Sequence, residues 1–183
     1  MDKWITILIL SSLILLSGSK VPEIVEVPVE VIVRDTVVIN EALYTLPDTV
    51  VFNHRISSTY KNRFHPVLKY WRFHYSIDIA MPTGTDITAD GNGRIKSIEY
   101  RRGGYGTNVI VSYGMNTEGK EVTIRYSHLS KVLVKVGQMV KKNEVIALSG
   151  VSGLCSGAHL DYCYMEDTEK LDPLTNLHII VLS

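Results

Sequence analysis

Hydrophobic and polar residues alternate in short runs over most of the chain, and a period of two predicts β-strands. β-branched and aromatic residues are frequent in the runs at residues 94–100, 107–114, 122–129 and 144–150. Turns rich in Gly, Asn and Asp separate these runs, and no long helical periodicity follows residue 51. The pattern therefore predicts an all-β domain of closely spaced short strands, built as a sandwich or a barrel.

The first fifty residues follow a different pattern. Lys3 precedes an apolar run at residues 4–16, which has the length of a signal-peptide core and is short for a membrane span. We therefore predict that residues 1–19 are a signal peptide or an N-terminal membrane anchor. Either assignment exports the rest of the chain to the periplasm or cell envelope, with a tether to the inner membrane through residues 4–16 as one alternative.

Residues 20–50 are rich in valine, isoleucine and acidic side chains, which predicts an extended acidic linker ahead of a domain at residues 51–183. Residues 51–165 carry 15 Lys and Arg against 8 Asp and Glu, although the formal net charge of the whole chain is zero. A basic domain favours an anionic partner such as a cell-wall polymer. The chain contains no recognisable nucleic-acid-binding motif, and the predicted export also argues against that partner.

Three of the six histidines lie in sequence settings that suit chemistry. His74 and Asp78 stand four residues apart in RFHYSIDIA, and both side-chain types are common zinc ligands. His128 ends a β run in YSHLS. In SGAHLD, His159 and Asp161 point to the same side of a strand that follows a loop rich in Gly and Ser. Each motif alone is compatible with a purely structural role.

In this order, and with the glycine turns between them, the three motifs resemble the lysostaphin-type, or LytM-like, zinc metallopeptidases. That family cuts peptide bonds in bacterial peptidoglycan. The resemblance covers residues 55–165. It implies a compact antiparallel β sandwich, or barrel-sandwich hybrid, with a groove-like active site, and a zinc metalloendopeptidase that acts on peptidoglycan peptide stems.

The resemblance also implies roles for single residues. His74 and Asp78 take the places of two zinc ligands, and His128 and His159 take those of the two catalytic histidines. Asp161 stands where the family's His-x-His motif has its second histidine, which is the third zinc ligand.

Tyr126 lies two residues before His128, so we expect it to face the same side and to contact substrate. Three lesser departures from the family pattern are Ser76 and Asn143 in place of glycine, and Tyr113 in place of histidine.

Asp161 is the departure with a chemical consequence. Its side chain is shorter than a histidine and adds a negative charge, so we expect weaker zinc binding and slower chemistry. Manganese, or no metal, are the alternatives for this oxygen-richer site. The alternative function is a non-catalytic domain that binds peptidoglycan or activates a partner wall hydrolase. A carrier module of the biotinyl type is disfavoured, because VKVGQMVKKNEVIALSG lacks the lysine between hydrophobic residues that such modules carry.

The two cysteines, Cys155 and Cys163, leave two alternatives open. They could form a disulfide in an oxidising compartment, or remain free thiols. Cys163 shares a strand face with His159, so its thiolate is a further candidate for the third zinc ligand.

Overall fold

The computed structural model describes residues 44–182, in which the regular structure is almost entirely β. The predictions for residues 1–19, and for most of 20–50, lie outside the described residues. The strands are β1 (Thr49–Phe52), β2 (Ile56–Ser58), β3 (Lys61–Phe64), β4 (Trp71–His74), β5 (Ile77–Ala80), β6 (Asp86–Thr88), β7 (Gly93–Tyr100), β8 (Thr107–Met115), β9 (Glu121–Ser127), β10 (Lys131–Val132), β11 (Met139–Val140), β12 (Val145–Leu148), β13 (His159–Glu166), β14 (Glu169–Leu171) and β15 (His178–Val181), and the helix is α2 (Pro173–Asn176).

The largest sheet has the strand order β11-β7-β8-β9-β13-β5-β2, with β14 beside β13, and its pairs are antiparallel. The four runs predicted as strands from their alternating pattern correspond to β7, β8, β9 and β12, so the predicted strands are confirmed. Turn chemistry sets the β8–β9 connection. The Asn116 side chain accepts hydrogen bonds from the backbone N–H groups of Glu118 and Lys120, and Gly119 adopts a left-handed φ of 78°.

Alternation along the strands divides the large sheet into two faces. Ile77, Tyr162, Tyr126 and Val109 lie opposite one another in β5, β13, β9 and β8, and each is at most 1% exposed. These side chains form one row of the hydrophobic core. The neighbouring residues in each strand project to the other face, which carries the polar side chains discussed below.

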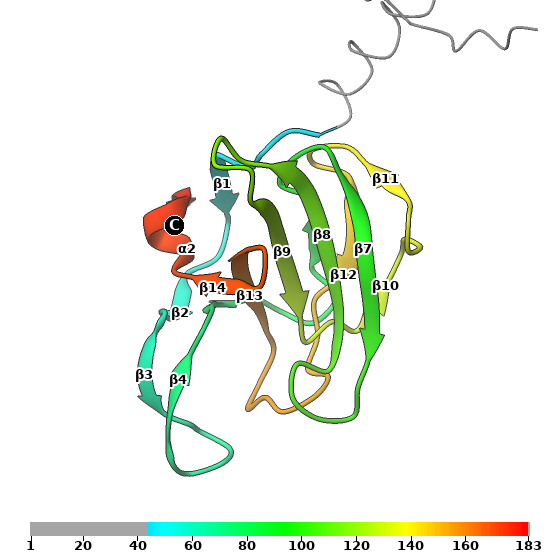
Figure 1. Cartoon of the computed structure of the whole chain (residues 1–183). Helices are drawn as coiled ribbons and strands as arrows, with labels where there is room; N and C mark the ends of the chain where they lie inside the picture. Colours follow the sequence, from blue (N-terminus) through cyan, green and yellow to red (C-terminus); the bar gives the residue numbers. More distant parts are fainter. Residues whose placement is uncertain (1–43, 183) are drawn as a thin grey trace, which may run out of the picture.

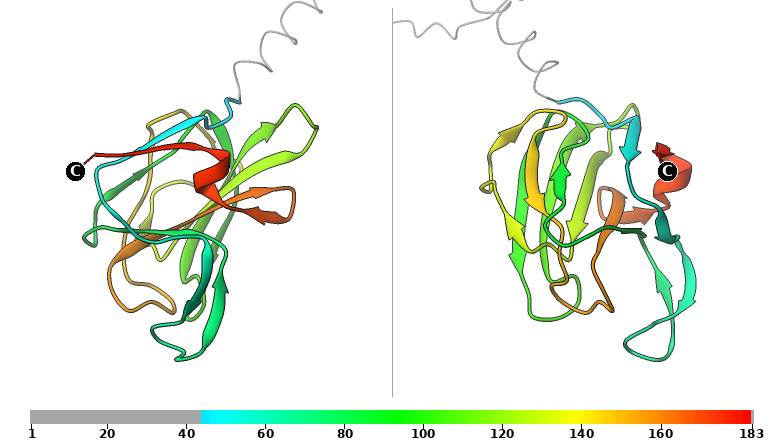
Figure 2. Two further views of the ribbon diagram at one scale, coloured as in Figure 1. Left: turned by 90° about the vertical axis from the view of Figure 1, so that its left-hand side faces the viewer. Right: turned by 180° about the vertical axis from the view of Figure 1, so that it is seen from behind.

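A second sheet, of order β10-β12-β6, contributes Ile87, Ile146 and Ala147 to the same core. Figures 1 and 2 show this smaller sheet behind β7, β8 and β9, so that the two sheets enclose the core between them. The strand order of the large sheet has two ends and forms no closed barrel. The predicted all-β sandwich is therefore confirmed.

The parallel pair β1–β15 and the short helix α2 close one side of the sandwich (Figure 1). β1 begins at Thr49. The backbone N–H of Thr45 already donates to the Asn92 carbonyl, at 2.9 Å. Within residues 44–182, no helix is long and apolar enough to cross a membrane.

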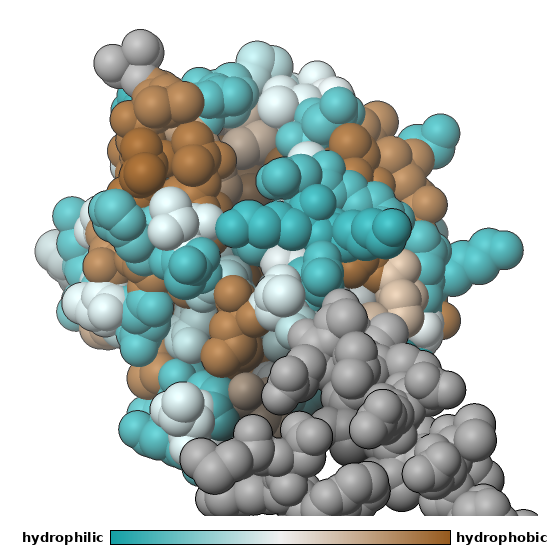
Figure 3. All heavy atoms as spheres, turned by 90° about the horizontal axis from the view of Figure 1, so that it is seen from above, coloured by the Kyte–Doolittle hydropathy of each residue, from teal (hydrophilic) through white to brown (hydrophobic). Residues whose placement is uncertain are grey.

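The hairpin of β3 and β4 projects from one end of the sandwich (Figure 1). It carries large exposed aromatic side chains, among them Phe64, Trp71 and Phe73. The opposite end, seen in Figure 3, shows hydrophobic and hydrophilic residues side by side. The hairpin matters for function because His74 is the last residue of β4.

Candidate metal and catalytic site

The candidate site lies on the polar face of the large sheet, where β5, β13 and β9 run side by side. Asp161 of β13 is paired in register with Asp78 of β5 on one side and with Ser127 of β9 on the other. Residues opposite one another in neighbouring strands project to the same face of a sheet. Strand pairing therefore brings together two carboxylates that lie far apart in the sequence.

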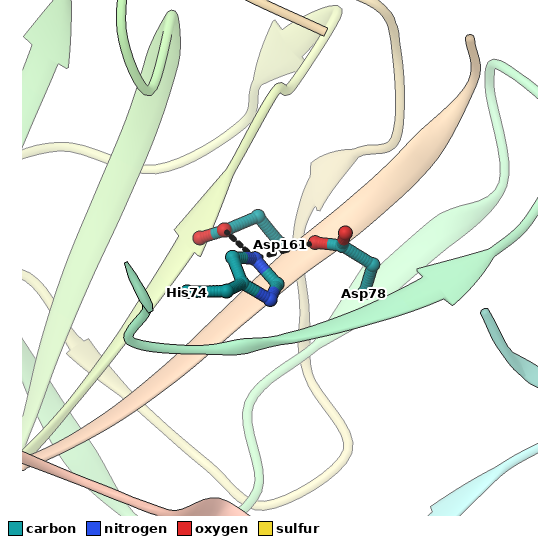
Figure 4. A group of neighbouring side chains, drawn as sticks. All are labelled: His74, Asp78 and Asp161. Atoms are coloured by element: carbon teal, nitrogen blue, oxygen red, sulfur yellow. Dashed lines mark hydrogen bonds and ion pairs between the residues drawn. The ribbon is translucent and has the colours of Figure 1, made fainter. Parts of the chain in front are cut away.

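His74 joins the two carboxylates from the end of β4. Its Nε2 atom lies 3.1 Å from Asp78 Oδ1 and 3.3 Å from Asp161 Oδ2. The three side chains point toward one another (Figure 4), and none is more than 9% exposed. One candidate donor atom from each residue lies within 4.8 Å of the other two. The structure thus brings together the three residues that the sequence suggests as metal ligands.

The charges in this cluster are strongly coupled. Burial lowers the pKa of His74, but the hydrogen bond with Asp161 and the charges of Asp78 and Asp161 outweigh it and raise this pKa to about 9. Burial raises the pKa of Asp161, but the hydrogen bond with His74, the charge of Arg125 and the hydrogen bond from Ser76 lower it to about 2. A raised histidine pKa beside a lowered aspartate pKa means that a metal ion and the His74 proton compete for the same donors.

The donor set fits a small divalent cation. Donors at about 2.1 Å from a tetrahedral zinc lie roughly 3.4 Å from one another, close to the 3.1 and 3.3 Å separations at His74 Nε2. Asp78 Oδ1 and Asp161 Oδ1 are buried and make no hydrogen bond. Nδ1 of His74 lies 3.2 Å from the Thr59 carbonyl, which holds the ring so that Nε2 faces the carboxylates.

Two further imidazoles stand next to this cluster. The rings of His128 and His159 have their centroids 4.7 Å apart. Nδ1 of His128 lies 2.7 Å from the Ser152 carbonyl, and Nδ1 of His159 lies 2.8 Å from the Gly157 carbonyl. Each Nδ1 can only donate to a carbonyl oxygen, which leaves Nε2 as a free acceptor when the ring is neutral. His159 Nε2 lies 3.6 Å from Asp78 Oδ1, so these bases adjoin the candidate metal site.

The backbone at His128 departs from the strand. β9 ends at Ser127, and His128 adopts a left-handed φ of 63° while its N–H donates to the Tyr105 carbonyl. A non-glycine residue in this region is uncommon and is held there by its surroundings. Burial lowers the pKa of His128, which favours the neutral imidazole required of a general base.

These side chains open into one groove of about 400 Å³. Its lining includes the five candidate residues, and the loop at residues 154–158 contributes to it. Arg63, Arg72 and Phe73 of the β3–β4 hairpin also line the groove. A groove with a buried ligand cluster, two free imidazole nitrogens and basic side chains is suited to hydrolysis of an extended substrate.

Tyr126 lies elsewhere. It is 1% exposed, packs in the core, and its hydroxyl donates to Asp90 Oδ2. The expectation that it shares a side with His128 assumes a regular pleat, which the left-handed backbone at His128 interrupts. We therefore do not include Tyr126 among the residues of the groove.

Both cysteines are free. Cys163 is buried, its thiol donates to the Tyr75 carbonyl, and burial raises its pKa to about 11. A thiol with a high pKa is a weak candidate for a metal ligand. Cys155 lines the groove, and burial raises its thiol pKa as well.

Sequence reasoning misses three residues that contact the carboxylates. Arg63 Nη1 lies 2.7 Å from Asp78 Oδ2, Arg125 Nη2 lies 3.8 Å from Asp161 Oδ1, and the Ser76 hydroxyl donates to Asp161 Oδ2 at 2.5 Å. Arg125 carries a usable signal, because it is a charge on the polar face of a strand that is otherwise buried. Arg63 carries no such signal, because its contact with Asp78 depends on the folding of the hairpin. Ser76 stands out in the sequence only as a departure from the family's glycine, which does not indicate its contact with Asp161.

Comparison with known proteins identifies the family to which this fold and these motifs belong. The model of Peptidase family M23 matches residues 72–173, which is more than half of the chain. An uncharacterized metalloprotease of Haemophilus influenzae is 40% identical over 122 residues, covering 66% of this chain and 25% of that protein. Peptidoglycan DD-endopeptidase ShyA of Vibrio cholerae is 41% identical over 109 residues, covering 59% of this chain and 24% of that protein.

Solved structures agree with these sequence matches. The catalytic domain of lysostaphin from Staphylococcus simulans superposes with a TM-score of 0.58 at 27% identity, covering 67% of this chain and 91% of that one. A zinc-containing peptidase from Vibrio cholerae gives 0.57 at 29% identity, covering 65% of this chain and 35% of that one. The matched region spans about a quarter of the length of the curated relatives. The fold, the motifs and the family match together show that the chain belongs to Peptidase family M23.

Proposed function

We propose that this chain is a zinc metalloendopeptidase that hydrolyses peptide cross-links of bacterial peptidoglycan. One observation carries the proposal: a buried His-Asp-Asp ligand cluster and two imidazoles with free Nε2 atoms meet in one groove. The family membership supports the reaction class, and the names of the DD-endopeptidase relatives support the substrate class.

In this proposal His74, Asp78 and Asp161 hold the metal. When bound, zinc supplies a Lewis acid for the scissile carbonyl and lowers the pKa of a water molecule. The oxygen-rich donor set is also compatible with manganese. Arg63 and Arg125 lie beside the two carboxylates and offset part of their negative charge, which moderates the loss of Lewis acidity expected from an aspartate in the third position.

His128 and His159 move the protons. Because each Nδ1 is held by a backbone carbonyl, the unprotonated Nε2 of one ring can accept the proton of the attacking water. The other ring, when it is protonated on both nitrogens, can donate its Nε2–H to the developing oxyanion. The ring that took the proton of the water can then pass that proton to the leaving amine. Burial lowers the pKa of His128, which favours its neutral form and makes it a candidate for the base near neutral pH.

The place of action follows from the substrate. Peptidoglycan lies outside the cytoplasmic membrane, so the proposal places the folded domain in the periplasm or cell envelope. The apolar run at residues 4–16 serves there as a signal peptide or as a tether. A partner wall hydrolase remains the proposed partner of the alternative, non-catalytic function.

Digestion of purified sacculi by the full chain tests the proposal. We expect cross-linked muropeptide dimers to be converted to monomers, with a new amine for each bond cut, and we expect a chelator to stop the reaction. The same assay with His159→Ala controls for contaminating hydrolases. Retention of the chain on sacculi without release of any monomer, in the presence of added zinc, would instead favour the non-catalytic binding domain.

A further inference from the structure

The Ser76 hydroxyl is the group closest to the Asp161 carboxylate. Ser76 lies between β4 and β5 and is 2% exposed. Its Oγ donates to Asp161 Oδ2 at 2.5 Å and lies 2.9 Å from His74 Nε2. It therefore contacts two of the three candidate ligands while belonging to neither of the strands that carry the carboxylates.

An aspartate in this position needs an orienting partner. The terminal torsion of an aspartate side chain has broad, weakly defined minima, so a carboxylate at the end of a short side chain is not aimed by its rotamer alone. Metal ligands in proteins are usually fixed by a hydrogen bond from a neighbouring group. A carboxylate oxygen accepts more than one contact, so a hydroxyl on Oδ2 leaves that oxygen able to face His74 Nε2 as well.

Arg125 holds the other side of the same carboxylate. Its Nη2 atom is buried, makes no hydrogen bond, and lies 3.8 Å from Asp161 Oδ1. The guanidinium is itself fixed, because its Cζ atom lies 3.5 Å from the centre of the Tyr105 ring and its Nε donates to Ser127 Oγ. A rigid positive charge behind Oδ1 favours the ionised carboxylate and opposes its rotation.

We propose that Ser76 is a positioning residue that aims the Asp161 carboxylate at the metal, with Arg125 as the fixed charge behind it. Ser76, Asp161 and Arg125 then act as one unit that replaces a single imidazole ligand. The inference rests on the proposed metal site and deepens it, because it explains how an aspartate serves as the third ligand.

An alternative role for Ser76, steric crowding of the ion, predicts the opposite change in metal affinity. Its Oγ lies so close to His74 Nε2 and Asp161 Oδ2 that it could crowd the ion instead of orienting a ligand. If it crowds the ion, removal of the hydroxyl strengthens metal binding. If it positions Asp161, removal weakens metal binding, and only while residue 161 is an aspartate.

Zinc affinity of the full chain, measured by competition with a chromophoric chelator, separates these roles. Ser76→Ala should weaken zinc binding by about 10-fold or more, the usual effect of losing an outer partner of a ligand. It should also change the absorption spectrum of the Co²⁺-loaded chain, which reports the coordination of the ion. Ser76→Gly removes the same hydroxyl and provides a second variant, and thermal melts confirm folding.

Two matched backgrounds complete the design. Ser112→Ala removes another serine hydroxyl that donates to a carboxylate, that of Glu121 at 2.7 Å, outside the groove, and should leave zinc affinity unchanged. In an Asp161→His background, Ser76→Ala should cause no loss, because the carboxylate acceptor is gone.

Zinc binding by Ser76→Ala that equals or exceeds that of the parent chain would overturn the inference, as would an equal loss in both backgrounds. Neither result touches the proposed hydrolysis. A parent chain that binds neither zinc nor cobalt overturns both proposals.

Discussion

Two carboxylate clusters lie back to back across β13, and their chemistry differs. Asp161 projects to the groove, whereas its neighbour Tyr162 projects to the core and donates a hydrogen bond to Asp90. Asp161 is surrounded by His74, Arg125 and a serine hydroxyl, and its pKa falls to about 2. Burial instead raises the pKa of Asp90, and the hydrogen bonds from Tyr126 and Tyr162 lower it only in part, so that the net pKa is about 6.

The difference teaches what makes a buried carboxylate available to a metal. The Asp90 carboxylate accepts hydrogen bonds from the hydroxyls of Tyr126 and Tyr162, and a third tyrosine, Tyr113, bonds to Tyr126. Neutral hydroxyls satisfy the oxygen but compensate little charge, so ionisation is costly there. At Asp161 the charges of Arg125 and His74 stabilise the carboxylate, and Oδ2 faces Nε2 of His74 at 3.3 Å. The Asp90 cluster therefore ties the core together, whereas the Asp161 cluster has the charge and donors that suit a bound ion.

The largest expected effect is a loss of hydrolysis rate on the groove side of the sheet. His128→Ala should lower the rate of muropeptide hydrolysis by about 10²- to 10⁴-fold, because it removes a general base. Bound zinc should stay near one ion per chain, since His128 is not among the three candidate ligands. Steady-state assays with elemental analysis of the same sample test this. A loss of metal together with activity would show that His128 belongs to the ligand set.

Asp90→Ala should affect folding and leave metal binding intact. The change deprives two buried tyrosine hydroxyls of their acceptor, and each unsatisfied buried donor costs about 1–3 kcal/mol. We therefore expect the free energy of unfolding to fall by about 2–6 kcal/mol, measured by urea denaturation. Zinc affinity of the folded variant should match that of the parent chain. A tenfold weaker affinity would mean that the two clusters are coupled through β13.

The two clusters should also respond to pH in separate windows. In the metal-free chain, the raised pKa of His74 contributes stability below its ordinary value of 6.5, and this contribution is lost as the pH rises toward 9. The raised pKa of Asp90 contributes stability below its ordinary value of 3.8, and this contribution is lost as the pH rises toward 6.

Melting temperatures from pH 3 to 10, with and without a chelator, resolve these windows. Saturating zinc should abolish the loss between pH 6.5 and 9, because bound metal requires the unprotonated His74 ring. Asp90→Asn should flatten the acid window only. A zinc-saturated chain that still loses stability between pH 6.5 and 9 would contradict the role of His74 as a ligand.

The smallest expected effect tests the position of Tyr126. Tyr126→Phe removes one hydrogen bond to Asp90 and should cost about 1 kcal/mol of stability. KM for muropeptides should not change, because the side chain is buried in the core. A several-fold rise in KM at unchanged stability would place Tyr126 in the substrate site after all.

The sequence predicts the strands for physical reasons that are local. The ligand cluster is predicted from the family resemblance instead, because Asp78 and Asp161 meet only through the pairing of β5 with β13. A period of two in hydrophobicity marks β7, β8 and β9. His74 and Asp78 are close in the sequence and stay close in the fold, because a short turn joins β4 to β5. Arg125 carries a signal as a charge within a strand that is otherwise buried, but its contact with Asp161 is not predictable, because that contact depends on the register between β9 and β13. The predicted face of Tyr126 differs from the observed one because nothing in the sequence indicates the left-handed backbone at His128.

The central claim is that Asp161 is a working metal ligand. Its most direct test is the metal content of the full chain, purified without chelator and supplied with zinc, measured by elemental mass spectrometry. We predict close to one zinc or manganese per parent chain, and less than about one tenth of that in Asp161→Ala under the same conditions. Equal metal content in the two proteins would contradict the account, and so would a parent chain that holds none.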